Sequence, residues 1–262
     1  MDTTAIPIVL VASGTATAAS QTYQRMDAAF RRHFPDNEIC WAYSSRAIRR
    51  RIQAQGGRDL ATPASVLADL YQRGYRQVAI QSLHLICGQE FHQMVWEAAQ
   101  SPLSIKIGLP LLAHPDDFDA LLDWMAGRLP ENARDALVMV GHGTAHPSWM
   151  TYEVLARRLG DRFGHQVCLG LISKGSGPDQ VVRIIQKGGF RRVVLRPFML
   201  VAGAHFSRDI AGDRPGSWKT ELESAGFTVF PEAQGLGADP AIQRIFVRHI
   251  RAALKSDPLI LS

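Results

Sequence analysis

The chain has 262 residues, 46% of them hydrophobic and 20% charged, which is the balance of a globular protein with a well-buried core. Its 29 Lys and Arg exceed its 24 Asp and Glu and give a formal net charge of +5, which suits an anionic ligand. Because no basic block is interleaved with aromatic residues and no apolar run could span a membrane, we expect neither nucleic acid nor a membrane as partner.

The N-terminal half alternates strands with helices. The apolar run Ile6 to Ala12 lacks the basic residues of a signal peptide, so we interpret it as a buried parallel strand. Further strands are predicted over 38–43, 77–86 and 105–109. Helices are predicted over 20–34, 45–54, 63–73, 90–99 and 116–128. This alternation predicts a parallel sheet with helical crossovers.

The C-terminal half repeats the alternation. Strands are predicted over 136–140, 166–172, 193–201 and 228–231. Helices are predicted over 148–163, 178–187, 218–225 and 240–254, with a long loop from the third strand through Asp213. The three cysteines are an odd number and lie far apart, which favours reduced thiols in a cytoplasmic protein.

The two halves also share sequence. The segment VAIQSLHLICGQEF (78–91) aligns without a gap with VVLRPFMLVAGAHF (193–206), and VASGT (11–15) aligns with VGHGT (140–144). Such self-similarity predicts an internal duplication. The expected fold is therefore α/β with two similar lobes, 1–130 and 131–262, each a parallel sheet flanked by helices, and with a cleft between the lobes.

The aligned positions where the halves differ are candidates for chemistry. His142 stands opposite Ser13, and His205 stands opposite Glu90. Ligands of open parallel sheets bind beyond the carboxyl ends of the strands, where both histidines are expected. Two imidazoles suit Co²⁺, Fe²⁺ or Ni²⁺ and could equally accept protons, although a histidine can also serve only as a hydrogen-bonding residue. We expect His84, inside a predicted strand, to be a packing residue.

Several motifs together carry a resemblance to a known family. They are VASGT, AYSSRAIRRRI, TPASVLADL, VAIQSLH with GQEF, MVGHGT, PFMLVAGAHF, SWK and GLGADPAI. In this order and spacing the chain resembles the anaerobic sirohydrochlorin cobaltochelatases of cobalamin synthesis, which are class II chelatases related to ferrochelatase. The resemblance implies a two-lobed α/β fold, sirohydrochlorin as the partner, Co²⁺ as the substrate metal with Fe²⁺ left open, and no nucleotide.

The resemblance also implies roles for individual residues. His142 and His205 match the metal-binding histidines, His142 is the expected proton acceptor, and Glu90 matches an acidic residue of the first lobe. The glutamate ligand of the family falls on Ser173, a poor metal ligand, so we expect weaker metal binding, with water or Glu90 in the third place. Arg46 is a candidate for the basic rim around the substrate carboxylates, with a solvated surface position as the alternative.

Other functions stay open at this point. The serine in place of the glutamate allows a non-catalytic tetrapyrrole or metal carrier, and histidine ligands do not select cobalt over iron, so a siroheme ferrochelatase is a further alternative. The GHGT segment faintly resembles histidine phosphatases, which need an arginine where Gly141 stands. The fold alone is also compatible with a bilobal solute-binding module, and a homo-oligomer is left open.

Overall fold

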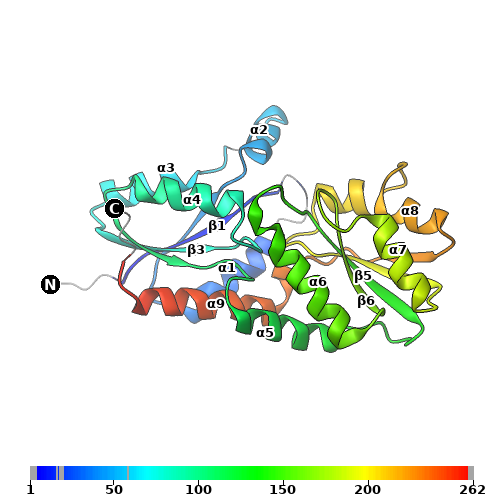
Figure 1. Cartoon of the computed structure of the whole chain (residues 1–262). Coiled ribbons are helices and arrows are strands. Elements are labelled where there is room, and N and C mark those ends of the chain that lie inside the picture. The colour runs from blue at the N-terminus through cyan, green and yellow to red at the C-terminus, as the bar shows by residue number, and fades with distance from the viewer. Residues whose placement is uncertain (1–4, 16, 18–20, 58, 259–262) are drawn as a thin grey trace. The chain divides into compact units, whose positions relative to one another are not determined.

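The computed structural model describes residues 5–15, 17, 21–57 and 59–258. The chain divides into two compact units, which Figure 1 shows in the colours of the sequence. Unit 1 combines the described parts of 1–16, 23–113 and 240–262, and unit 2 combines those of 17–22 and 114–239. Each unit contains one four-stranded sheet.

The sheet of unit 1 is entirely parallel. Its strands are β1 (Ile8–Ala12), β2 (Ile39–Tyr43), β3 (Gln77–Ser82) and β4 (Ser104–Gly108), in the order β2-β1-β3-β4. All five residues of β1 are buried because helices cover both faces of this central strand. The continuous apolar run at the N-terminus is therefore a core strand, as the sequence predicts.

Helices form the rest of the regular structure of unit 1. They are α1 (Gln21–His33), α2 (Arg46–Ala54), α3 (Pro63–Gln72), α4 (Gln89–Ala99) and α9 (Pro240–Lys255). The helices α3 and α4 bury Leu67, Leu70 and Met94 against one face, and α9 packs against β3 and β4 on the other (Figure 1). The helix α2 contains no buried residue and projects away from the sheet.

The sheet of unit 2 repeats this topology. Its strands are β5 (Asp135–Gly141), β6 (Val167–Leu171), β7 (Arg192–Pro197) and β8 (Thr228–Pro231), all parallel in the order β6-β5-β7-β8. The longer helices are α5 (Pro115–Ala126), α6 (Met150–Phe163), α7 (Pro178–Lys187) and α8 (Trp218–Ser224). Short 3-10 helices lie at Pro147–Trp149 and Leu236–Ala238. The predicted α/β duplication is confirmed.

The core of unit 2 lies between its sheet and the helices α7 and α8. Val138 and Leu195 of the strands pack there with Ile185 of α7 and Trp218 of α8. A Cβ atom on Gly170 of β6 would come within 2.0 Å of the indole of Trp218, so the glycine makes room for this ring. This packing fixes one face of β5 and β7, the two strands that lead into the candidate site.

The units exchange one helix each. The helix α5 follows β4 of unit 1 but belongs to unit 2, and α9 follows β8 of unit 2 but belongs to unit 1. This differs from the expected division at 130/131, because α9 covers β3 and β4, and His249 bonds the carbonyl oxygen of Leu109 at 3.0 Å. Apart from the short segment 17–22, which is assigned to unit 2, the chain passes between units at 113/114 and 239/240, within the repeated AHP and ADP segments.

Two other expectations differ from the structure. The strand predicted over 193–201 ends at Pro197, and the strand predicted over 77–86 ends at Ser82, although the apolar sequence continues in both. The long loop predicted before Asp213 contains a π-helix at Phe206–Ile210, with Ala211 N donating to Phe206 O at 2.7 Å. No helix within the described residues is long and apolar enough to cross a membrane.

Candidate metal centre

The strand order places each candidate residue at a topological switch point. In both sheets the chain first crosses to one side of the central strand and then to the other, so a crevice opens between β1 and β3, and between β5 and β7. Ser13 follows β1, and Glu90 follows β3 in the first turn of α4. His142 directly follows β5, and His205 follows β7 after a short loop. The duplication therefore brings the differing residues to equivalent edges.

His142 is held by a glycine turn. Gly143 has a φ of +76°, which favours glycine, and a Cβ atom there would lie 2.5 Å from Ser173 Oγ. The imidazole Nδ1 lies 3.1 Å from Gly143 O, and a carbonyl oxygen can only accept, so Nδ1 carries the proton in this bond. The side chain is exposed, and Nε2 is the ring nitrogen left with a lone pair.

His205 lies at the start of the π-helix. Its Nδ1 is 2.6 Å from Oδ2 of Asp209, four residues further along. π-Helical turns are rare overall, but those that occur are often at functional sites. Here the turn places the carboxylate of Asp209 within hydrogen-bond distance of the imidazole. Because an ionised carboxylate only accepts, Nδ1 of His205 is also the donor and Nε2 has the lone pair.

The two imidazoles lie against each other within unit 2. Their ring centroids are 4.7 Å apart and their planes cross at 82°. A metal-bound imidazole nitrogen lies about 2 Å from the ion, so rings at this separation can both bind one ion through Nε2. Among the residues that the structure describes, no group of three or more His, Cys, Asp or Glu side chains forms a metal site. The pair alone could therefore supply only two of the ligands that a metal ion needs.

Asp209 is a buried anion beneath His205. Its side chain is 7% exposed and accepts hydrogen bonds from Arg208 and Arg214 in addition to His205. Burial alone would raise the pKa of Asp209, but the bonds and charges of Arg208 and His205 outweigh burial and lower it to about 2. The carboxylate is therefore ionised at neutral pH.

Ser173 supports the loop of His142. Its Oγ donates to His142 O at 2.8 Å and its backbone N–H donates to the same oxygen at 3.0 Å. The hydroxyl proton of Ser173 is thus engaged in a hydrogen bond to the backbone. The neighbouring Lys174 is exposed. The expectation that Ser173 is a poor substitute for a carboxylate ligand stays a prediction.

Unit 1 has a different arrangement at the equivalent edge. Oε2 of Glu90 accepts from Ser13 Oγ at 2.5 Å and from Ser44 Oγ at 3.0 Å, and it lies 3.3 Å from His84 Nε2. The other nitrogen of His84 is 2.8 Å from Ser82 Oγ. This polar cluster joins the ends of β1, β2 and β3.

The strand pattern predicts that His84 is only a packing residue, but these contacts make it part of the polar cluster. β3 ends at Ser82, so His84 lies beyond the strand, where its ring reaches Ser44 and Glu90. Burial alone would raise the pKa of Glu90, but hydrogen bonds from His84 and Ser13 contribute to lowering it to about 2. Glu90 is consequently an anion at neutral pH and a weak proton acceptor.

Arg46 begins α2, which follows the end of β2 at the same edge of unit 1. Its side chain is exposed, whereas Arg49 on the same helix donates to the carbonyl oxygens of Tyr43 and Ser44. Arg49 therefore stabilises the start of the helix. Arg46 lies where an anionic ligand could meet it, and its role stays a prediction.

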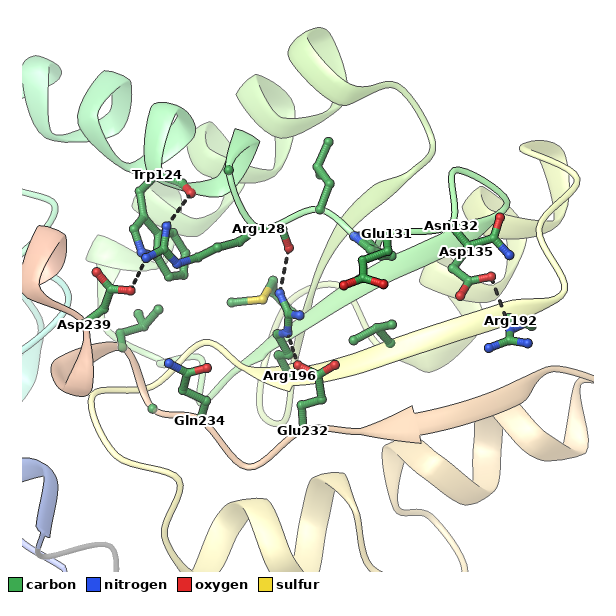
Figure 2. Close-up of a pocket in the computed structure, with 17 residues that line it drawn as sticks. Trp124, Arg128, Glu131, Asn132, Asp135, Arg192, Arg196, Glu232, Gln234 and Asp239 are labelled. Carbon is green, nitrogen blue, oxygen red and sulfur yellow. Dashed lines mark hydrogen bonds and ion pairs between the residues drawn. The ribbon is translucent and has the colours of Figure 1, made fainter.

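A cavity of about 540 Å³ elsewhere in unit 2 has different chemistry (Figure 2). Its lining contains the ion pairs Arg128–Asp239, Arg196–Glu232 and Arg192–Asp135. Asp135 and Arg192 begin β5 and β7, so this end of the cavity lies at the opposite ends of the strands from His142 and His205. Because three acidic side chains of the lining already pair with arginines, the cavity is a weaker candidate for a charged ligand than the sheet edge.

Sequence reasoning missed three polar residues of these clusters. Asp209 could have been found from its spacing of four from His205, which places two side chains on one face of a helix. His84 and Ser44 have a weaker signal, because their contact depends on where β2 and β3 end.

Comparison with known proteins finds relatives over most of the chain. The family model "Cobalt chelatase (CbiK)" matches residues 5–255. The sirohydrochlorin cobaltochelatase of Salmonella typhimurium is 34% identical over 225 residues, which cover 84% of each chain. The sirohydrochlorin cobaltochelatase CbiKC of Nitratidesulfovibrio vulgaris is 32% identical over 260 residues, which cover 95% of this chain and 90% of the relative.

Solved structures show the same fold at lower identity. SirB from Bacillus subtilis with Fe³⁺ has a TM-score of 0.66 at 15% identity, with 95% of both chains covered. CbiX, the terminal enzyme for biosynthesis of siroheme in denitrifying bacteria, has a TM-score of 0.58 at 17% identity, covering 95% of this chain and all of that one.

Proposed function

Because the chain belongs to the cobalt chelatase (CbiK) family, we propose that it inserts Co²⁺ into sirohydrochlorin as an enzyme of cobalamin biosynthesis. The observation that carries the proposal is the pair of imidazoles at the β5/β7 edge, whose Nε2 atoms can bind one ion. The alternative of a non-catalytic carrier is not favoured, since both curated relatives are named as cobaltochelatases.

The reaction replaces two pyrrolic protons of the macrocycle with one divalent ion, so it needs an acceptor for protons and partial dehydration of the metal. An imidazole can perform either task near neutral pH. We assign His142 and His205 to binding the ion. Once the ion has passed from Nε2 of His142 to the macrocycle, the same nitrogen accepts one pyrrolic proton, and the second proton passes to solvent water. The exposure of His142 supports this assignment, because a planar substrate must reach the acceptor nitrogen.

Glu90 has a different part in the proposal. As an anion with a pKa of about 2 it is a poor proton acceptor at neutral pH, so we assign it an electrostatic or metal-binding role. Ser13 holds its Oε2 through the 2.5 Å bond. Arg46 would bind substrate carboxylates, and Ser173 would keep the His142 turn in place.

The insertion needs no nucleotide in this proposal, and Fe²⁺ is a second substrate metal, because imidazole binds both ions. The test mixes the full-length protein with sirohydrochlorin and Co²⁺ and follows the visible spectrum of the ring without any nucleotide. We expect metalation faster than in a buffer control. Binding of the ring without faster metalation would contradict the enzyme and favour a carrier. A parallel reaction with Fe²⁺ under anaerobic conditions measures the metal preference.

A further inference from the structure

The contacts of Asp209 go beyond a single hydrogen bond to His205. Oδ2 accepts from His205 Nδ1 at 2.6 Å and from Arg208 Nη2 at 3.0 Å. Oδ1 accepts from Arg208 Nε at 3.1 Å and from Arg214 Nη2. Both oxygens of a carboxylate that is 7% exposed are thus held by cationic donors.

We propose that Asp209 is a positioning residue that fixes His205 as the Nδ1–H tautomer, so that Nε2 is the nitrogen presented to the metal. This rests on the proposed function for the identity of the ligand, but the tautomer itself is a property of the free protein. A hydrogen bond from the second ring nitrogen to a carboxylate sets which nitrogen can bind a metal and increases its basicity.

Because Arg208 and Arg214 donate hydrogen bonds to Asp209, replacing one of its two oxygens with an NH₂ group has a different effect at Oδ1 than at Oδ2. In an Asp209→Asn variant, one of the two oxygens becomes an NH₂ group. If the NH₂ group replaces Oδ1, it faces donors of both Arg208 and Arg214. If it replaces Oδ2, it faces only one guanidinium donor and can donate to Nδ1 of His205. Fewer donor–donor contacts favour the second orientation.

The second orientation reverses the tautomer of His205. An NH₂ group that donates to Nδ1 requires the ring proton to sit on Nε2, which then cannot bind a metal without losing that proton. Asp209→Asn, a substitution of almost equal size, is therefore expected to block the metal-binding nitrogen. A residue that only filled space would not have this effect.

The experiment measures the tautomer directly. Long-range ¹H–¹⁵N spectra of the metal-free, ¹⁵N-labelled full chain are recorded at rising pH until the His205 signals stop changing, and they then report which nitrogen of the neutral ring carries the proton. A His205→Ala sample assigns the signals. We expect Nδ1–H in the wild type and Nε2–H in Asp209→Asn, and 10- to 100-fold weaker Co²⁺ binding by calorimetry in the variant. Nε2–H in the wild type, or Nδ1–H retained in the variant, would overturn the proposal.

Two controls separate positioning from general loosening. Asp161→Asn removes an exposed carboxylate that pairs with Arg157 on α6, and it should change neither the tautomer nor Co²⁺ binding. Arg214→Met loosens the same loop but keeps the carboxylate, so His205 should remain Nδ1–H, and a reversed tautomer there would contradict the proposal. If Asp209→Asn fails to fold, the wild-type spectrum alone decides. A wild type with Nδ1–H but without metalation would refute the function and leave the tautomer assignment standing.

Discussion

The candidate edges of the two sheets have a similar backbone conformation but differ in the side chains that they present. Both follow the same strand order, and both have a glycine with positive φ after the central strand, Gly14 at +101° and Gly143 at +76°. In unit 1 the carboxylate of Glu90 accepts hydrogen bonds from the hydroxyls of Ser13 and Ser44. In unit 2 the imidazoles donate through Nδ1 and leave Nε2 with a lone pair.

The duplicated backbone sets where the side chains lie at both edges, while the residue types determine the chemistry of each edge. The polar groups of the unit 1 edge largely satisfy one another. The unit 2 edge has two ring nitrogens directed by bonds to Gly143 O and Asp209. Substitutions at matched positions of the two edges can therefore test the assignment of metal chemistry to unit 2.

The largest effect is expected at the histidines. His142→Ala and His205→Ala should each lower the rate of Co²⁺ insertion by about 10²- to 10⁴-fold, because each removes a metal-binding or proton-accepting nitrogen. Ser13→Ala, at the position equivalent to His142, should cost at most about tenfold. Insertion rates from the visible spectrum measure this, with circular dichroism to check folding. If Ser13→Ala lowered the rate of Co²⁺ insertion as much as His142→Ala, the assignment of metal chemistry to unit 2 alone would be wrong.

The next effect concerns the missing carboxylate ligand. Ser173→Glu should tighten Co²⁺ binding by about tenfold, because a carboxylate adds an anionic ligand near the imidazole pair. The backbone bond from Ser173 N to His142 O can remain, so the turn is retained. Calorimetric titration measures the affinity. Ser176→Glu adds the same charge to the same loop as a control, and equal tightening in both variants would assign the gain to charge alone.

A smaller effect is expected at the basic helix. Arg46→Ala should raise KM for sirohydrochlorin about two- to fivefold and leave kcat nearly unchanged, since an exposed ion pair contributes about 1 kcal/mol or less. Steady-state rates at two salt concentrations measure this, and the difference should shrink at high salt. Arg157→Ala on α6 of unit 2 is the matched control. A fall in kcat without a change in KM would argue against a substrate-binding role.

The last prediction concerns the stability of the protein, not its activity, and is a dependence on pH. The pKa of Glu90 falls from an ordinary 4.5 to about 2 in the folded protein, so its contribution to stability is full above about pH 4.5 and is lost as the pH falls toward 2. The Tm of the wild type should therefore exceed that of Glu90→Gln at pH 6, and the gap should narrow between pH 4.5 and 3. Glu153→Gln, in unit 2, serves as a control. A Tm difference that does not change with pH would contradict the assignment of Glu90 as a hydrogen-bonded anion.

Much of the fold could be predicted from the sequence because it depends on local patterns. The apolar run of β1, the Thr62–Pro63 start of α3 and the repeated segments all report structure within a few residues. The ends of β3 and β7 were overestimated, because apolar residues continue beyond both strands into buried loop positions such as Leu83 and Phe198. Burial and strand pairing are separate properties, and only burial leaves a hydrophobic pattern.

The sequence could predict those site residues that come shortly after the end of a predicted strand. The structure brings His142 and His205 together, as their shared lobe indicated, and brings Ser13 to Glu90. Asp209 was missed because the sequence analysis predicts a loop over 206–210, where a spacing of four from His205 does not imply a shared helical face. His84 was missed because its contacts with Ser44 and Glu90 join segments far apart in the chain.

The exchange of α5 and α9 has a consequence for the order in which the protein can fold during synthesis. The helix that covers one face of β3 and β4 is synthesised after all the strands of unit 2, since α9 (Pro240–Lys255) follows β8 in the chain. The strands β3 and β4 must therefore wait with one apolar face uncovered until the strands of unit 2 have been synthesised. A nascent chain arrested before residue 240 should be captured by chaperones and digested by protease far more readily than the finished protein.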